Sequence, residues 1–214
     1  MKSYVITVMN IPESVDAAQR CIDSMPQFDI KMFSGYTPDD DPDAIAKKHR
    51  LNTTRFDDPR YSRRQRCLSA FLSHRRLWER CRDTGEEIQV FEHDAVGVGD
   101  VPEFLNYQGC ISLGSPSYGQ FNHPPNLGVN PLTSKRYFPG AHAYRMKPRA
   151  ARAILEHARD FAAPTDIFLH LDHFPWLEEY YPWPVMANDK FSTIQNEGGC
   201  LAKHGYNKGS YRLL

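Results

Sequence analysis

The chain has 214 residues, a length typical of one domain or of one domain with extensions. A hydrophobic fraction of 41% is enough to build a buried core, which excludes a wholly disordered chain. Its 26 basic and 26 acidic side chains give a formal net charge of zero, which argues against proteins that coat nucleic acid or anionic membrane through bulk charge.

The first half of the chain alternates between strand-like and helix-like patterns. The predicted elements, in order, are a strand at residues 3–9, a helix at 15–25, a strand at 29–33, an acidic loop at 36–42, a helix at 62–82 and a strand at 88–91. The helix at 62–82 has the clearest pattern, because its apolar residues recur at spacings of three and four.

The second half continues the alternation. We expect a strand at 110–113, a long polar segment at 114–136, a strand at 141–146, a helix at 149–158, short helical turns at 166–171 and 177–180, and a last strand at 183–187. Long segments without secondary structure are commonly lids or binding loops. The order predicts one α/β domain over residues 1–195, with a mostly parallel central sheet flanked by helices, and a polar tail at 196–214 that could cover an active site.

The sharpest chemical feature follows the strand expected at residues 88–91. There, Glu92 and Asp94 stand on either side of His93. Ligands of open α/β sheets bind outside the carboxyl ends of the strands. Carboxylate oxygens suit Mg²⁺ or Mn²⁺, which also bind substrate phosphates. The pattern indicates a metal site at Glu92 and Asp94, although a strand that ends in a solvated acidic turn explains the same residues.

The helix at 62–82 carries a histidine and many arginines. His74 lies on its apolar stripe between Phe71 and Trp78, which is typical of a core histidine. Residues 60–82 contain eight arginines and one acidic residue, Glu79. These arginines form either a solvated helix face or a surface that receives phosphates, which arginine binds in bidentate fashion.

A dense titratable cluster lies at residues 166–173. It contains Asp166, His170, Asp172 and His173. One of these groups could act as a general base near a reacting hydroxyl. A zinc site is a weaker interpretation, because no thiol or spaced histidine triad accompanies the cluster. Surface charges on a helix explain the cluster equally well.

Several segments, in order, resemble glycosyltransferase family 25, which includes lipopolysaccharide sugar transferases and collagen galactosyltransferases. The matching segments are residues 67–74, Leu77-Trp78, residues 90–94, residues 140–144 with Ala150-Ala151, Pro164-Thr165-Asp166, and residues 181–194. The family pattern has Glu-Asp-Asp where this chain has Glu92, His93 and Asp94. Ordered matches over most of the chain are more specific than a single motif.

The resemblance implies a GT-A fold, in which one Rossmann-like domain binds a nucleotide sugar, commonly a UDP sugar, with Mn²⁺ or Mg²⁺. It implies sugar transfer to a hydroxyl acceptor with inversion, and metal ligands at Glu92 and Asp94. Asp166 is the first candidate for the general base and Asp172 the second. Expected donor-binding residues are Thr7, Asn10, Gly35, His74, Glu92 and His93.

The acceptor implied by the resemblance is a bacterial surface saccharide, and a nucleic-acid acceptor is less favoured. The sequence contains no apolar run long enough to cross a membrane and no signal-peptide pattern. Its five cysteines include no C-x-x-C pair, which favours a reducing cytoplasm. Two other classes stay open: a degenerate protein that binds nucleotide or glycan without turnover, and a small metal-dependent hydrolase built on residues 166–173.

Overall fold

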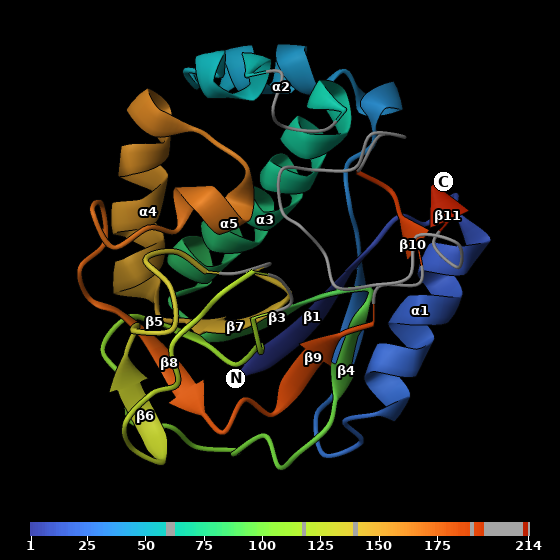
Figure 1. Ribbon diagram of the computed structural model, residues 1–214. Coiled ribbons are helices and arrows are strands. Elements are labelled where there is room, and N and C mark those ends of the chain that lie inside the picture. Colours follow the sequence, from blue (N-terminus) through green and yellow to red (C-terminus); the bar gives the residue numbers. More distant parts are fainter. Residues whose placement is uncertain (59–62, 117–118, 139–140, 189–190, 195–211, 214) are drawn as a thin grey trace.

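The computed structural model describes residues 1–58, 63–116, 119–138, 141–188, 191–194 and 212–213. Within these ranges, seven strands form one central sheet in the order β2-β1-β3-β7-β5-β8-β6 (Figure 1). In chain order these strands are β1 (Lys2–Thr7), β2 (Ile30–Ser34), β3 (Ile88–Glu92), β5 (Cys110–Ser112), β6 (Gly128–Pro131), β7 (Ala143–Met146) and β8 (Leu177–Tyr181).

The sheet is mixed, with three parallel and three antiparallel pairings among its described strands. Strand β1 pairs in parallel with β2 and β3, and β5 pairs in parallel with β8. Strand β7 runs antiparallel to β3 and β5, and β6 runs antiparallel to β8. Five of these seven strands therefore share one direction, so the expected α/β class is confirmed, with two reversed strands in the sheet.

Helices cover both faces of the sheet, as Figure 1 shows. Buried residues of α1 (Pro12–Asp23) cluster with Val5 and Phe91 on one face. Those of α3 (Arg64–Thr84) and α4 (Pro148–Phe161) cluster with Tyr4 and Val90 on the other face. This division follows from the alternation of side chains along each strand.

Shorter elements complete the described part. They are the helices α2 (Pro42–Lys48) and α5 (Thr165–Phe168), the 3₁₀ helices η1 (Pro38–Asp40) and η2 (Thr54–Asp57), and two strand pairs. Strand β4 (Ala95–Gly97) pairs antiparallel with β9 (Val185–Ala187), and β10 (Phe191–Ser192) pairs in parallel with β11 (Arg212–Leu213) beside α1 (Figure 1). Strand β11 belongs to the expected tail, whose residues 196–211 and 214 lie outside the described ranges. Among the described helices, none has the length and apolar character that a membrane crossing requires.

The helix predicted at residues 62–82 is confirmed in the described residues as α3, and Ser62 lies outside them. Gly85 follows the helix with φ of 67°, a conformation that glycine adopts without strain. The loop expected at 36–42 is wrong in part, because it contains η1 and leads into α2, whose first residue is Pro42. The polar segment at 114–136 is likewise interrupted by β6.

The helical turn predicted at residues 177–180 is wrong, because these residues belong to strand β8. Glutamate favours helices in isolation, but tertiary contacts override that preference here. Glu178 accepts a hydrogen bond from Gln108 N at 2.6 Å. Glu179 accepts one from Thr133 N at 2.6 Å and one from Ser134 N at 2.7 Å. The buried carboxylates satisfy backbone groups of neighbouring segments only from an extended strand.

Candidate functional site

A chain of hydrogen bonds connects three elements at the carboxyl end of β3. The indole Nε1–H of Trp78 donates to the hydroxyl oxygen of Tyr144 at 2.7 Å. That hydroxyl lies 3.0 Å from His74 Nδ1, and His74 Nε2 lies 3.0 Å from Glu92 Oε1. Helix α3 supplies His74 and Trp78, whose spacing of four puts both on one helix face.

The partners in this chain fix the positions of the protons. An ionised carboxylate only accepts hydrogen bonds, so Nε2 of His74 carries the proton that is donated to Glu92. The Tyr144 hydroxyl, which accepts from Trp78, then donates to His74 Nδ1. Burial lowers the pKa of His74 to about 3, against an opposing effect of the Asp166 charge. His74 is therefore a neutral side chain that holds one oxygen of Glu92 in place.

The ends of β1 and β2 pack tightly against α3. The amide of Gly35 donates to Thr7 O at 2.9 Å, and the amide of Tyr36 donates to Ser73 Oγ at 2.8 Å. A Cβ at Gly35 would lie 3.1 Å from Ile6 Cγ2 and 3.3 Å from Ser73 Oγ. A residue without a side chain thus allows the two strand ends and the helix to meet closely.

Two of the other expected donor-binding residues differ in exposure. Thr7 is fully buried, and its hydroxyl donates to Val5 O at 3.0 Å, so its side chain contributes to the core. Asn10 is exposed in the turn between β1 and α1. The structure therefore leaves Asn10 accessible beyond the carboxyl end of β1 and places the Thr7 side chain inside the protein.

His93 points away from Glu92 and toward α1. Its Nδ1 lies 3.0 Å from Ser14 Oγ, which accepts a hydrogen bond from Val8 N at 2.9 Å. Its ring stacks on Phe191 of β10 with ring centroids 5.3 Å apart. Burial, with a smaller contribution from the charge of Arg20, lowers the pKa of His93 to about 4. The residue that replaces the central aspartate of the family pattern is thus a neutral packing group between β3, α1 and β10.

The two candidate metal ligands lie near different helices. Glu92 accepts from His74 of α3 and is 28% exposed. Asp94 lies near Cys21 of α1, where burial and, second, the negative charge of Asp94 raise the pKa of the thiol to about 12. The backbone oxygen of Asp94 accepts from Asn188 N at 2.8 Å.

The candidate metal ligands at this edge of the sheet are carboxylate oxygens. In the part of the chain that the structure describes, no group of three or more histidine, cysteine or acidic side chains is placed to hold a metal ion. Two carboxylates, Glu92 and Asp94, fit Mn²⁺ or Mg²⁺ only when phosphates and water supply the other ligands, which is a common arrangement for Mg²⁺. The described residues therefore show no preformed metal site, and Glu92 and Asp94 could hold an ion only together with such additional ligands.

The two candidate bases have different surroundings. Asp166 begins the first turn of α5, and its charge acts on His74, Lys135 and Tyr137. Asp172 is exposed, forms an ion pair with Arg136, and has Oδ2 3.4 Å from His170 Nδ1. Of the two candidates, Asp166 is therefore the one whose charge affects the pKa of His74.

The titratable cluster at residues 166–173 does not converge on one point. The ring of His173 packs against His157 at 4.4 Å and Phe161 at 5.3 Å, measured between centroids. The ring of His170 stacks on Tyr137 at 6.3 Å. His170 also lies 3.4 Å from Asp172, and its ring centroid is 6.1 Å from that of His173. Among the described residues, however, no such group is placed to hold a metal ion, which disfavours the metal-dependent hydrolase interpretation.

A pocket of about 730 Å³ lies on the segment before β7 and reaches His170. Its lining includes Phe121, His123, Lys135, Arg136, Tyr137 and His170. The sequence predicts a lid or binding loop at residues 114–136, but no pattern in it points to these lining residues. Tyr144 and Trp78 were also missed as site residues, although both lie in segments that resemble the glycosyltransferase family.

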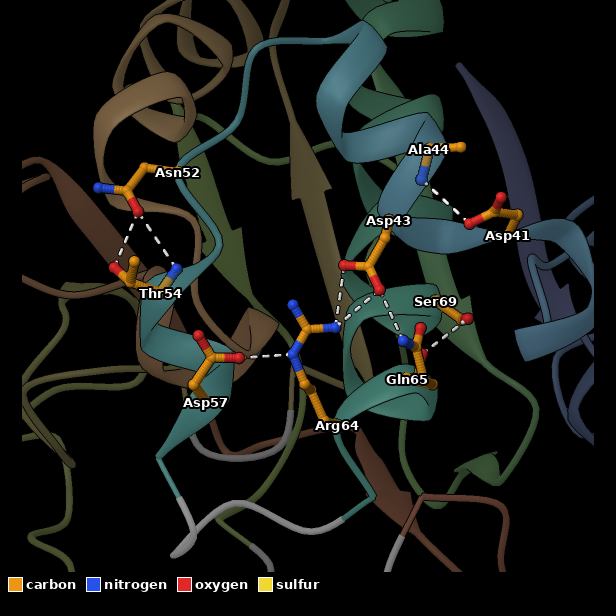
Figure 2. Close-up of polar contacts among 9 residues, drawn as sticks. All are labelled: Asp41, Asp43, Ala44, Asn52, Thr54, Asp57, Arg64, Gln65 and Ser69. Atoms are coloured by element: carbon orange, nitrogen blue, oxygen red, sulfur yellow. Dashed lines mark hydrogen bonds and ion pairs between the residues drawn. The ribbon is translucent and has the colours of Figure 1, made fainter.

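The arginines of α3 have partners within the protein. Figure 2 shows Arg64 between η2 and α2, with Nε donating to Asp57 at 2.6 Å and Nη1 donating to Asp43 at 2.9 Å and 3.0 Å. Gln65 donates to the same Asp43 at 2.6 Å. Farther along the helix, the guanidinium of Arg76 lies 4.7 Å from the ring centroid of Phe33. Much of the basic surface is therefore engaged in contacts within the protein.

Comparisons with models of known protein families and with characterised proteins found no match. The fold is a mixed α/β fold, consistent with a Rossmann-like domain, in which helices cover both faces of the sheet. Its function is therefore inferred from its own residues: the strand ends with Glu92 and Asp94, the buried chain through His74, and the adjoining pocket.

Proposed function

We propose that this protein is a glycosyltransferase of GT-A type that moves a sugar from a nucleotide donor, UDP being the first choice, to a hydroxyl acceptor. One observation carries the proposal. Trp78, His74, Glu92 and Tyr144 come from separate segments that resemble glycosyltransferase family 25, and they form one hydrogen-bonded chain at the end of β3. If the resemblance were due to chance, these segments would not be expected to contact one another.

The donor diphosphate would bind at the carboxyl ends of β1, β2 and β3, where ligands of such sheets bind. Glu92 and Asp94 would hold Mn²⁺ or Mg²⁺ together with that diphosphate. The ion would neutralise negative charge on the departing nucleoside diphosphate. His74 orients Glu92 through Nε2–H, and burial keeps its imidazole neutral, so it adds no competing positive charge.

Asp166 would accept the proton of the acceptor hydroxyl. The hydroxyl oxygen then forms a bond to the anomeric carbon as the bond from that carbon to the diphosphate oxygen breaks, and a single displacement inverts the anomeric configuration. A carboxylate close to the reacting hydroxyl is the usual requirement for such a base. Asp172 is the second candidate, and its ion pair with Arg136 makes it the weaker one.

We also propose that the protein works in the cytoplasm on a saccharide acceptor. Cys21, Cys67, Cys81 and Cys110 are buried cysteines, which is compatible with a reducing compartment. Nucleic acid is the less favoured acceptor, because Arg64 is paired with carboxylates and Arg76 lies over an aromatic ring.

The test is calorimetric titration of UDP with and without Mn²⁺, followed by UDP release from UDP sugars with a panel of saccharide acceptors. Wild type should bind UDP more tightly with Mn²⁺, and Glu92→Gln and Asp94→Asn should each weaken that enhancement at least about tenfold, since each removes a charged ligand. Asp83→Asn is the matched control, because Asp83 is an exposed carboxylate paired with Arg82 at the end of α3.

Two outcomes would contradict the proposal. Absence of UDP binding under all metal conditions would exclude a UDP-dependent enzyme. Tight UDP binding without release of UDP, with every donor and acceptor tried, would instead identify a nucleotide-binding protein without turnover. Retention of the Mn²⁺ enhancement in both variants would contradict the metal assignment alone.

A further inference from the structure

The pocket before β7 has the size and composition of a ligand site. Its volume of about 730 Å³ falls within the range of roughly 300–1,000 Å³ that is common for small-molecule sites. Two cationic side chains, Lys135 and Arg136, line it together with the imidazoles of His123 and His170. The lining side chains in the described residues include no carboxylate, although Asp172 pairs with Arg136 from outside the lining.

The two cations lie in different settings. Lys135 is half-buried, with Nζ 5.6 Å from the ring centroid of Tyr137. Arg136 is more exposed, and Asp172 holds its guanidinium at the rim. An ammonium that has lost part of its water interacts more strongly with an anion than a fully solvated one, because the local dielectric constant is lower. Lys135 is therefore the candidate anion-binding group of the pocket.

Aromatic side chains lie at another side of the pocket. Phe121 is 37% exposed, and its ring centroid lies 5.4 Å from that of His123 and 5.6 Å from that of Trp183. Trp183 in turn packs edge-on against Tyr181 at 5.1 Å. Exposed aromatic faces carry negative charge density that attracts the C–H groups of a sugar ring. The combination of a cation and an exposed aromatic ring fits a sugar that carries an acidic group.

The pocket also adjoins the candidate base. The charge of Asp166 acts on Lys135 and Tyr137, which line the pocket, and on His74, which holds Glu92. Backbone hydrogen bonds from Phe138 N to Leu169 O at 3.0 Å and from Leu171 N to Arg136 O at 2.8 Å also join the pocket segment to the residues that follow α5, the helix that contains Asp166. A ligand in the pocket could present a hydroxyl to Asp166 while its acidic group contacts Lys135.

We propose that this pocket binds the acceptor, and that the acceptor is a saccharide whose ring carries a carboxylate or a phosphate. The role of the ligand as an acceptor rests on the proposed function, but the binding of an acidic sugar can be measured without turnover. Lys135 would neutralise the acidic group and Phe121 would pack on the sugar ring.

The experiment is saturation-transfer NMR and calorimetry with three probes of similar size: methyl glucuronide, glucose 6-phosphate and neutral methyl glucoside. Both acidic sugars should bind, and the neutral glycoside should bind at least about tenfold more weakly, as expected for loss of a charge-assisted hydrogen bond. The two acidic probes show whether a carboxylate or a phosphate is preferred. Inorganic phosphate alone should bind more weakly than glucose 6-phosphate, because it lacks the ring that contacts Phe121.

Variants separate the parts of the proposal. Lys135→Gln should weaken the acidic sugars about tenfold and leave UDP affinity unchanged, and Phe121→Ala should weaken all three sugars. Lys31→Gln is the matched control, because Lys31 is an exposed lysine on β2 that pairs with Asp29. Thermal melting of each variant verifies that it is folded.

Equal affinity for acidic and neutral sugars, or unchanged affinity in folded Lys135→Gln, would overturn the inference. Binding of inorganic phosphate as tight as that of glucose 6-phosphate would overturn its saccharide part. If the acidic sugars bind but UDP does not, the proposed transferase function fails and the pocket assignment survives. If Lys135→Gln weakens UDP instead, the pocket belongs to the donor and the acceptor assignment is wrong.

Discussion

Nε2 of His74 lies 3.0 Å from Oε1 of Glu92, and this contact joins the middle of helix α3 to the end of strand β3. The histidine is 1% exposed, whereas the carboxylate is 28% exposed. A buried neutral donor therefore orients a carboxylate that still reaches solvent. The contact gives a core histidine a direct influence on the candidate site.

Removal of the Tyr144 hydroxyl should destabilise the protein. Tyr144→Phe leaves the indole N–H of Trp78 and Nδ1 of His74 without their partner, and each unsatisfied buried group costs about 1–3 kcal/mol. Urea unfolding at neutral pH measures the loss, with Tyr137→Phe as the control at a partly exposed ring. A loss below about 0.5 kcal/mol would contradict the importance of the buried chain.

Stability should fall as the pH drops below about 6.5. His74, with a pKa of about 3, and His93 and His142, each with a pKa of about 4, stay neutral in the folded protein, because burial disfavours their charged forms. In the unfolded chain they take up protons below their ordinary pKa of about 6.5. The unfolded state therefore binds more protons between about pH 4 and 6.5, and acid favours unfolding.

A variant isolates the contribution of one histidine. His93→Asn keeps a polar partner for Ser14 but does not titrate. Its unfolding free energy should depend on pH less steeply than that of wild type, by up to about 1.4 kcal/mol per pH unit between pH 4.5 and 6. Parallel curves for the two proteins over that range would show that His93 is charged in the folded state.

The ion pairs of Arg64 should stabilise the start of α3 modestly. Arg64→Ala removes the contacts to Asp43 and Asp57 drawn in Figure 2, which tie α2 and η2 to the helix. We expect a loss of about 1 kcal/mol, since the pairs are partly exposed, and a smaller loss in 1 M salt because of screening. Arg82→Ala is the control, because Arg82 pairs with its exposed neighbour Asp83. Equal losses in the two variants would argue against a network effect.

Gly35→Ala should disturb the strand ends. The new methyl group would lie 3.1 Å from Ile6 Cγ2 and 3.3 Å from Ser73 Oγ, so β2 or α3 must shift. Overpacking of this kind costs typically about 1–3 kcal/mol. Gly99→Ala is the control, because its nearest neighbour would be Pro184 Cα at 3.7 Å. Thermal unfolding compares the two, and equal melting temperatures would contradict close packing at Gly35.

Much of the fold could be predicted from the sequence where periodicity is strong. Strand β1 and helix α3 follow directly from apolar runs and from spacings of three and four. Strand β8 could not be predicted in this way, because its glutamates favour a helix in isolation. They are accommodated in a strand by hydrogen bonds from the backbone amides of Thr133, Ser134 and Gln108. Those partners lie more than 40 residues away and leave no local pattern.

The candidate site likewise contains some residues that the sequence predicts and others that it does not. Glu92 and Asp94 stand out because they follow a buried strand, which is a local feature. The link from His74 to Tyr144 depends on a reversed strand between β3 and β5, which the alternation of strands and helices does not reveal. The pocket residues Phe121 and Lys135 meet through loop geometry, which has no periodicity to detect.

The reversal of β7 changes where sequence variation would act on this protein. Because β7 runs against its neighbours, the residues that precede it lie at the same edge as the residues that follow β3, and Glu92 N donates to His142 O at 2.9 Å. Under the proposed function, insertions or substitutions ahead of Ala143 would therefore alter substrate selection. Changes after Met146 would reach only the opposite edge, where α4 begins. Relatives that differ in substrate should thus diverge most before β7 and retain the turn between β7 and α4.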